Sequence, residues 1–375
     1  MKELKNIISA IEDLEKTKET AIATLVKVSG STYRSPGARM LISSDGNNIG
    51  AISGGCLESD VFEKAQTVIK SGNPRVITYD TTSEEDMIWG LGLGCQGIAY
   101  VLIEPLEENK LQEIDFIKKC LSSRSYGAIA TVIRVEGEAT TQVGQRLLLG
   151  DNTIINNLTD DNLLTEVLSD TKAALQNNSS ILKEYNLATI KIEVFIEVIQ
   201  PPLSLIVFGA GYDVLPLVNF SKQLGWDVTV VDNRQREASK KRFEQADKIQ
   251  LSSPEDILEN IEITERTVAV VMSHNYLDDL EMLNLLLPFN LKYLGILGPK
   301  KRTNRILKEL QEEEITVNAN IYSPVGLDIG ADNAEEIALS IIAEIQAVIS
   351  HRDAGFLKNR NAPIHAKEEL ATDNL

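Results

Sequence analysis

The stretch Ala21-Ile-Ala-Thr-Leu-Val-Lys-Val28 returns 107 residues later as Ala128-Ile-Ala-Thr-Val-Ile-Arg-Val135. The likeness extends over residues 21–42 and 128–149, where nine of 22 aligned positions are identical. Both stretches have the composition of a strand. A repeat of this length indicates a duplicated module. We therefore expect an N-terminal α+β domain over 1–200, with copies at about 21–106 and 128–200 that share one sheet or one core.

The two copies differ in length. After one deleted residue Asp45 aligns with Asp151, an offset of 106, whereas Val101-Leu-Ile-Glu104 aligns with Val194-Phe-Ile-Glu197 at an offset of 93. The first copy therefore contains 13 additional residues between its helix, expected at about 57–69, and this last strand.

The second copy serves as an internal control for function. Gly37 and Arg39 occur in both copies, so we interpret them as structural. Three features occur only in the first copy: Arg34, the turn Ser53-Gly-Gly-Cys-Leu-Glu58 and the glycine-rich loop Gly90-Leu-Gly-Leu-Gly-Cys-Gln-Gly97. Chemistry is accordingly expected in the first copy.

Two of the three cysteines lie in these glycine-rich turns. Cys56 precedes a predicted helix, where amide groups and the helix dipole favour a thiolate that can bind a soft metal or carry sulfur. Cys95 sits among glycines that leave room for a bulky ligand. Glu58 is either a proton carrier or an ordinary first-turn acid. The predicted catalytic residues are Cys56, Cys95 and Glu58, the two cysteines are the predicted metal contacts, and Gly54, Gly55 and Gly94 are predicted to contact a cofactor. Buried, inert cysteine is the alternative, and we expect it for Cys120.

A second domain is predicted at 203–352, after Gln200-Pro-Pro202. Short apolar runs at 205–208, 227–231, 267–272 and 292–297 alternate with helical segments, which is typical of a doubly wound parallel sheet of Rossmann type. Its last helix begins with Asn333 and Glu336 in capping-box spacing. The chain is expected to open with a helix over 2–19, and 353–375 reads as a polar tail. The fold class is therefore α/β.

Gly209-Ala-Gly211 follows a strand and opens a helix, as phosphate-binding turns do, and Asp232 ends the next strand, where a ribose hydroxyl would bind. NAD is thus an alternative ligand. Against it, Val214 replaces the third glycine, and Asp213 places a carboxylate where a phosphate would lie. We expect the Asp213 side chain to cap the helix.

Further candidates for anion or cofactor contacts are Arg34, His274, Lys300 and Arg302. His274 follows a strand at the sheet edge where α/β folds bind ligands, and Lys300 and Arg302 begin a helix after Gly298-Pro299. Solvated surface charge is the alternative for the basic residues.

Charge and composition exclude several classes of protein. The 375 residues carry a net charge of −18, which makes nucleic acid an unfavourable partner. Three cysteines without a CxxC pair predict a reducing compartment rather than a disulfide scaffold. Without an apolar signal segment or a run of 18 apolar residues, we expect a cytoplasmic protein with no membrane span.

These motifs together resemble the xanthine dehydrogenase accessory factor family, called XdhC/CoxI. The resemblance covers about residues 10–350 and rests on Ser53–Glu58, Gly92–Gly97, Gly209–Gly211 with Asp232, Pro324-Val-Gly-Leu-Asp-Ile-Gly-Ala331 and Glu335–Leu339. It implies a protein that binds molybdenum cofactor (molybdopterin), supports its sulfuration and delivers it to an apo molybdenum hydroxylase such as xanthine dehydrogenase. The family's glycine-flanked cysteines match Cys56 and Cys95.

The resemblance also implies partners and leaves alternatives. The partners would be the apo hydroxylase and a sulfur donor such as a cysteine desulfurase, and a homodimer stays open. A cofactor-maturation chaperone is favoured over a turnover enzyme. The alternatives are an NAD-dependent oxidoreductase, which Gly209, Gly211 and Asp232 suggest, and a stable accessory subunit of the hydroxylase.

Overall fold

The computed structural model describes residues 1–14, 19–81, 97–187, 190–252, 254–257, 260–317, 320–361 and 364. The chain divides into two compact units, one comprising Glu3–Pro201 and the other beginning at Pro202. Each unit is described by itself below.

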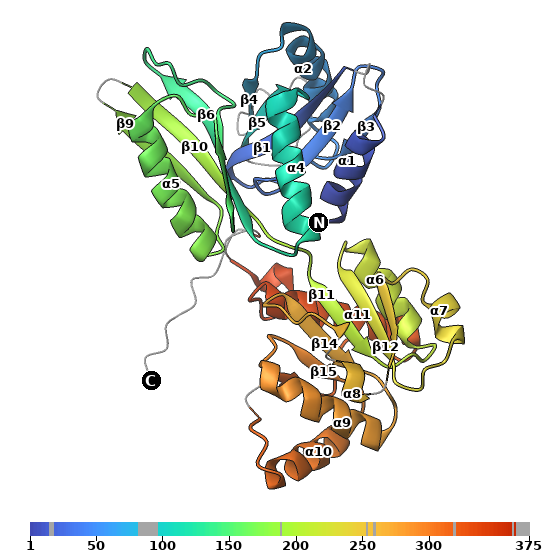
Figure 1. Cartoon of the computed structure of the whole chain (residues 1–375). Helices are drawn as coiled ribbons and strands as arrows, with labels where there is room; N and C mark the ends of the chain where they lie inside the picture. The colour runs from blue at the N-terminus through green and yellow to red at the C-terminus, as the bar shows by residue number, and fades with distance from the viewer. Residues whose placement is uncertain are drawn as a thin grey trace. The chain divides into compact units, whose positions relative to one another are not determined.

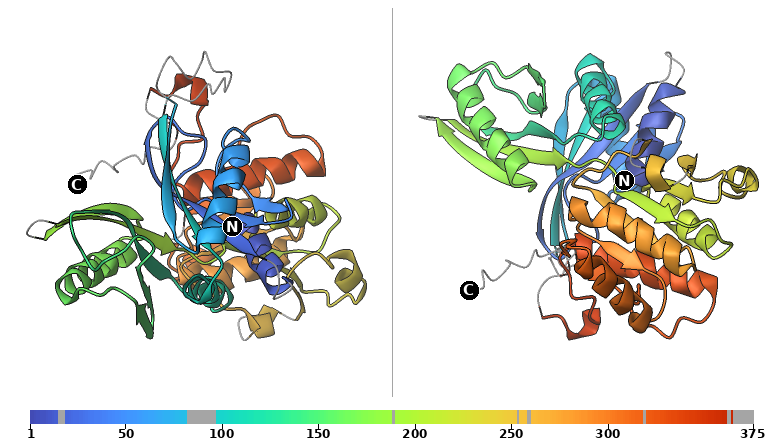
Figure 2. Two further views of the ribbon diagram at one scale, coloured as in Figure 1. Left: turned by 90° about the horizontal axis from the view of Figure 1, so that it is seen from above. Right: turned by 60° about the horizontal axis from the view of Figure 1, so that its bottom comes forward.

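Two antiparallel five-stranded sheets with the same strand order form the N-terminal unit (Figures 1 and 2). The first has the order β3 (Asn48–Gly50), β2 (Arg39–Ser43), β1 (Thr20–Gly30), β5 (Gly97–Pro105) and β4 (Arg75–Asp80). The second has the order β8 (Thr153–Asn156), β7 (Arg146–Gly150), β6 (Gly127–Glu136), β10 (Ile190–Ile199) and β9 (Ile181–Leu187). One helix follows the third strand of each copy, α2 (Glu58–Ser71) and α5 (Asp161–Gln176). The predicted duplication is confirmed.

The copies share a core but not a sheet, so the alternative of one common sheet is wrong. Ile22 of the first copy and Ile129 of the second belong to one cluster of buried side chains. Helix α4 (Glu108–Ser122), which links the copies, contributes Ile117, and helix α1 (Lys2–Glu12) contributes Ile7. Helix α1 ends at Glu12, before Leu14, the last residue of the apolar repeat, and is therefore shorter than expected.

Buried ion pairs cross between the copies in a swapped arrangement. Arg39 of β2 contacts Glu197 of β10, with Nη1–Oε1 2.8 Å apart. The residues at the equivalent repeat positions pair in the opposite direction, Arg146 of β7 with Glu104 of β5. A Cβ on Gly37 would lie 2.8 Å from Oε1 of Glu197, so this glycine makes room for the pair. The residues that both copies retain are thus the ones that join the copies.

Helix α4 adds one base and one acid to this cluster. Lys110 Nζ lies 2.7 Å from Glu104 and 2.9 Å from Glu113, and Glu113 also contacts Arg39 and Arg146. The buried cluster therefore contains three positive and three negative groups. Pairing of this kind is what makes buried charges tolerable.

The additional residues of the first copy lie in one hairpin. Tyr79 of β4 is paired with Ala99 of β5, and the equivalent Tyr185 of β9 is paired with Ile192 of β10. Fifteen residues, 82–96, separate Thr81 from Gly97 in the first copy, and two residues, 188–189, separate Leu187 from Ile190 in the second. This difference equals the change in repeat offset, so the 13 additional residues fall within the segment 82–96, which contains Cys95 and lies outside the described residues.

The C-terminal unit has a six-stranded parallel sheet. Its order is β13 (Lys248–Leu251), β12 (Asp227–Asp232), β11 (Ser204–Phe208), β14 (Thr267–Val271), β15 (Leu294–Ile296) and β16 (Ile321–Tyr322). Helices α6 (Val214–Gln223) and α11 (Ala334–Ile349) pack on one face, and α9 (Tyr276–Leu286) and α10 (Lys300–Glu312) pack on the other. This is the predicted doubly wound fold.

Shorter elements and caps complete this unit. Helices α7 (Ala238–Arg242) and α8 (Pro254–Ile257) and the 3₁₀ turns Leu287–Phe289 and Leu357–Asn359 join the larger elements. Asn333 and Glu336 form the predicted capping box of α11. Among the residues the structure describes, no helix is both long enough and apolar enough to cross a bilayer.

Candidate functional site

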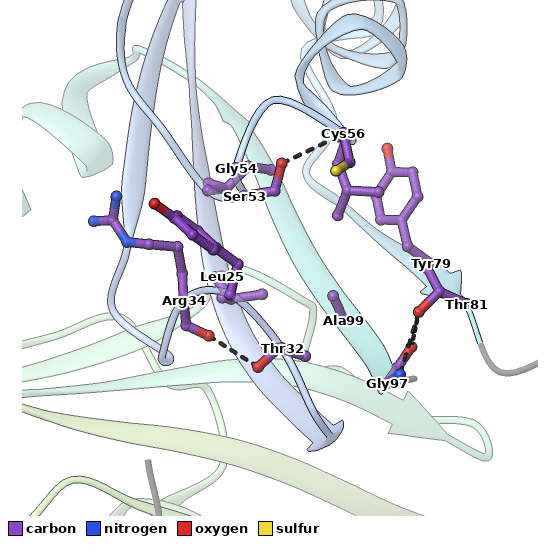
Figure 3. A pocket seen from close by; sticks show the side chains of 13 residues that line it. Leu25, Thr32, Arg34, Ser53, Gly54, Cys56, Tyr79, Thr81, Gly97 and Ala99 are labelled. Carbon is purple, nitrogen blue, oxygen red and sulfur yellow. Dashed lines mark hydrogen bonds between the residues drawn. The ribbon is translucent and has the colours of Figure 1, made fainter. Parts of the chain in front are cut away.

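Several features found only in the first copy line one pocket with about 450 Å³ of empty space. Figure 3 shows its side chains, among them Arg34, Ser53, Gly54, Cys56, Tyr79 and Gly97. Arg34 comes from the connection between β1 and β2, Cys56 from the turn before α2, and Gly97 from the start of β5. The structure therefore brings together Arg34, Gly54 and Cys56 of the predicted residues. Cys95 and Gly94 lie outside the described residues.

Cys56 is exposed at the end of a tight turn. Helix α2 begins at Glu58, two residues after Cys56, and its N-cap residue Leu57 makes no side-chain capping bond. Gly55 has φ +106°, a conformation that residues with a Cβ rarely adopt. The glycine pair thus turns the chain sharply and places the cysteine on the pocket.

Glu58 holds this turn in place. Its carboxylate accepts hydrogen bonds from the Ser53 amide at 2.8 Å, from the Leu57 amide at 3.2 Å and from the Ser53 hydroxyl. Burial favours the neutral acid, but these hydrogen bonds outweigh it and lower the pKa of Glu58. A carboxylate tied in this way supports the turn that carries Cys56 and is poorly placed to donate a proton.

Arg34 supplies a positive charge to the wall of the pocket, and this charge is already paired with a carboxylate. Its Nη2 lies 2.5 Å from Oε2 of Glu3 in α1, and Glu3 also accepts from the Ala51 amide. The Arg34 side chain is 30% exposed, so an anionic ligand would share the guanidinium with Glu3. The pair also ties α1 to the rim of the pocket.

Two tyrosines of the pocket were not predicted from the sequence. Tyr79 donates a hydrogen bond of 2.8 Å to Asp60, and Tyr185 in the second copy donates one of 2.9 Å to Asp170. Because this tyrosine is present in both copies, the repeat itself could have identified it as structural. The other is Tyr33, which the second copy replaces with Thr140.

In the second copy the same loops close on themselves. Thr159 and Thr140, which replace Ser53 and Tyr33, are joined by a 3.3 Å hydrogen bond. Asp160, which replaces Gly54, caps α5 by accepting from the Leu163 amide at 2.9 Å. The module therefore folds with ordinary polar contacts where the first copy has the pocket.

In the C-terminal unit, the acceptors that a ribose would need are already used. Asp232 is buried, and its two oxygens accept from the Arg234 amide, from Arg236 and from the Ser239 hydroxyl. Burial favours the neutral acid, but these hydrogen bonds lower the pKa of Asp232. A Cβ on Gly209 would lie 2.3 Å from the Met272 carbonyl oxygen, so this glycine is required by the packing of the sheet. Gly211 follows in the same turn.

The prediction that the Asp213 side chain caps α6 is wrong. Asp213 is at the N-cap position but makes no capping bond, and its Oδ2 lies 2.7 Å from Nε2 of His274. The two meet because β11 and β14 are neighbours, so their carboxyl-end loops adjoin. Beside them Arg242, which was not predicted, donates to the Ala210 carbonyl at 2.7 Å and covers the Tyr212 ring.

The two predicted basic residues of α10 differ in their surroundings. Lys300 is exposed at the first position of the helix. Arg302 turns back to the sheet, donates to the Leu297 carbonyl at 2.7 Å and pairs with the buried Asp279. Burial raises the pKa of Asp279. Arg302 is therefore held in an internal ion pair, while Lys300 faces solvent.

Comparison with known proteins gives two family matches. The XdhC and CoxI family matches residues 14–80, and the XdhC Rossmann domain matches residues 205–345. A protein from Bacillus subtilis, named as a probable subunit of xanthine dehydrogenase, is 36% identical over 88% of this chain and 94% of its own length. The chain belongs to the XdhC/CoxI family.

Two further proteins match this chain over nearly its whole length. A molybdenum cofactor insertion chaperone from Escherichia coli, PaoD, is 23% identical over 92% of this chain and 88% of its own length. A crystal structure from Bacillus halodurans, described as a xanthine dehydrogenase, is 31% identical with a TM-score of 0.76 and covers 95% of this chain and 98% of that one.

The XdhC/CoxI match covers most of the residues that line the pocket. Residues 14–80 include Arg34 and the whole turn Ser53–Glu58. Within the described part of the chain, no cluster of three or more His, Cys, Asp or Glu side chains is arranged to hold a metal ion. Cys56 is thus a single exposed sulfur on a pocket, rather than part of a described multi-ligand metal site.

Proposed function

We propose that this XdhC/CoxI protein binds molybdenum cofactor at the pocket beside Cys56, supports its sulfuration and delivers it to an apo molybdenum hydroxylase of the xanthine dehydrogenase type. The observation that carries the proposal is the exposed Cys56 on a pocket that residues of the first copy alone create. The names of two relatives, a molybdenum cofactor insertion chaperone and a probable xanthine dehydrogenase subunit, support the choice of cargo and client.

The pocket suits such a cargo in chemistry. The cofactor combines a planar pterin, a dithiolene with molybdenum, and a phosphate. The pocket is open, and its empty space of about 450 Å³ includes solvent at its mouth, so a ligand of this size would lie partly outside the enclosed part. A cysteine thiolate is a soft donor suited to molybdenum and sulfur, and the Arg34 guanidinium can share its charge with a phosphate. The cofactor brings its own dithiolene ligands, so the protein needs few metal contacts.

Cys95 has a defined place in this proposal. The segment that contains it leaves the sheet at Thr81 and returns at Gly97, whose amide and carbonyl both bond to Thr81. Thr81 and Gly97 both line the pocket. We propose that Cys95 meets the same cargo as Cys56, and that sulfur is supplied by a separate donor such as a cysteine desulfurase.

Retention of cofactor tests the role of the cysteines. Wild-type protein and the variants Cys56→Ser and Cys95→Ser would be purified from molybdate-fed cells and analysed for molybdenum and pterin. Both variants should retain several-fold less cofactor than wild type. Cys120→Ser is the matched control, because Cys120 is buried in α4 among the core residues and should leave retention unchanged. Equal retention by all four proteins would contradict the proposal.

A stable association with the hydroxylase is the second candidate. The Bacillus subtilis relative is named as a subunit, which favours it. Co-purification with the client at fixed stoichiometry after cofactor loading would indicate a subunit, whereas release after loading would indicate a chaperone. NAD is not included in the proposal because the Asp232 acceptors that would recognise its ribose are already occupied.

A further inference from the structure

Tyr33 exposes an aromatic ring at the rim of the pocket. It lies in the connection between β1 and β2, and 65% of its surface is exposed. A Cβ on Gly54 would lie 3.5, 3.5 and 3.6 Å from Cδ2, Cγ and Cδ1 of this ring. Three nearly equal distances mean that Gly54 faces the flat side of the ring. Since the residue is largely exposed, its other side stays open.

The fold does not need this arrangement. The second copy has Thr140 in place of Tyr33 and Asp160 in place of Gly54, and it forms the same strand pairing between β6 and β7 as the first copy between β1 and β2. Exposing a large aromatic ring forgoes the stabilisation that burying it would give. An open ring supported from behind by glycine, next to an exposed thiol, is better explained by a ligand than by stability.

We propose that Tyr33 is a positioning residue that stacks on the planar heterocycle of the bound cargo, with Gly54 supporting its rear face and Cys56 meeting the sulfur end of the same ligand. The inference rests on the proposed function, because that function supplies a ligand with a pterin ring. Aromatic side chains and flat heterocycles attract through offset stacking. Stacking needs the aromatic ring but not the hydroxyl, so phenylalanine at position 33 should preserve binding.

Binding of pterin-6-carboxylate, a pterin without molybdenum or dithiolene, tests the platform separately from the thiol. Fluorescence anisotropy titrations would compare full-length wild type with Tyr33→Phe, Tyr33→Ala and Tyr33→Thr, the last being the residue of the second copy. We expect Phe to bind as wild type does and Ala and Thr to bind about tenfold more weakly. Phe356→Ala, which removes an exposed ring in the other unit, is the control.

The same proteins would be assayed for molybdenum and pterin after expression in molybdate-fed cells. A change of less than twofold in Tyr33→Ala, or no binding of the probe by wild type, would overturn the platform. If wild type still retained cofactor in that case, the proposed function would stand without it. If wild type retained no cofactor, the proposed function would fail. Thermal unfolding would verify that each variant is folded.

Discussion

Gly54 and Gly55 are adjacent, but only the second is held in a conformation that requires glycine. Gly55 has φ +106°, so a Cβ there strains the backbone, and we expect Gly55→Ala to destabilise the first copy by about 1–2 kcal/mol. Gly54→Ala places its methyl group at ordinary contact distance from Tyr33 and should change stability by less than about 0.5 kcal/mol. Hydrogen exchange of β1 and β2 amides in urea would measure both.

The pair of variants is its own control, because the two substitutions are identical and lie side by side. Gly55→Ala should also displace Cys56 and lower cofactor retention, whereas Gly54→Ala should retain the pocket. Equal stability of the two variants would show that the turn is not strained at Gly55.

At the residue scale, the sequence predicted contacts within a turn better than contacts between distant segments. Arg34, Gly54 and Cys56 could be grouped because the second copy showed which residues the module does not need. Asp213 was assigned to its own helix because capping is a local rule, whereas its partner His274 lies 61 positions away. Tyr33 gave no local signal, since only the folded turn places Gly54 behind its ring.

At the scale of single elements, the segment between β4 and β5 is expected to serve cofactor binding without being needed for the fold. Both hairpins have the same register up to their loops, so the 13 additional residues are not needed to pair the strands. Replacing residues 82–96 with Ala188-Thr189 of the second copy should therefore leave the first sheet intact. Cofactor retention, measured as molybdenum and pterin content, should be lost.

Cys95→Ser in the full-length loop is the comparison that interprets this deletion. If the deletion and the single substitution lose the same amount of cofactor, the loop acts through its cysteine. If the deletion variant retains cofactor as wild type does, the loop has no part in binding. A loss of protection of β4 and β5 amides from hydrogen exchange would instead show that the loop is structural.

The element order was also predictable to different degrees in the two units. Alternating apolar runs and helices identified the doubly wound sheet because each parallel strand must be followed by a crossover helix. The repeat identified two equal modules, but not whether they share a sheet. Whether two modules share a sheet depends on whether their edge strands pair. The edge strands are β3 and β4 in the first sheet and β8 and β9 in the second, and the copies meet through buried side chains instead.

At the scale of the whole N-terminal unit, the two copies depend on each other through buried charge. The swapped pairs of Arg39 with Glu197 and Arg146 with Glu104 place each copy's arginine on the other copy's glutamate. Glu113 of α4 touches both arginines. If the two copies separated, each would expose buried charges that the other copy neutralises. Breaking such buried pairs typically costs about 3–5 kcal/mol. The first copy, which carries the pocket, is thus stabilised in part by the second copy.

Acid should weaken the junction between the copies, because Glu113 stays ionised in the folded protein at pH values where the same group in the unfolded chain is protonated. Burial favours the neutral form of Glu113, but Lys110, Arg146 and Arg39 outweigh burial and lower its pKa to about 2. Because the folded pKa is depressed, Glu113 contributes its full stabilisation above about pH 5 and loses it as pH falls towards 2, a change of about 3 kcal/mol. Urea unfolding followed by hydrogen exchange of β6 and β7 amides at pH 6, 5, 4 and 3 would measure this change in the free energy of unfolding.

Glu113→Gln should be less stable at pH 6, and its free energy of unfolding should depend less on pH, because it has no carboxylate to protonate. Glu108→Gln, at an exposed position of the same helix, should keep the wild-type pH dependence. An unchanged slope in Glu113→Gln would mean that the junction does not depend on this carboxylate.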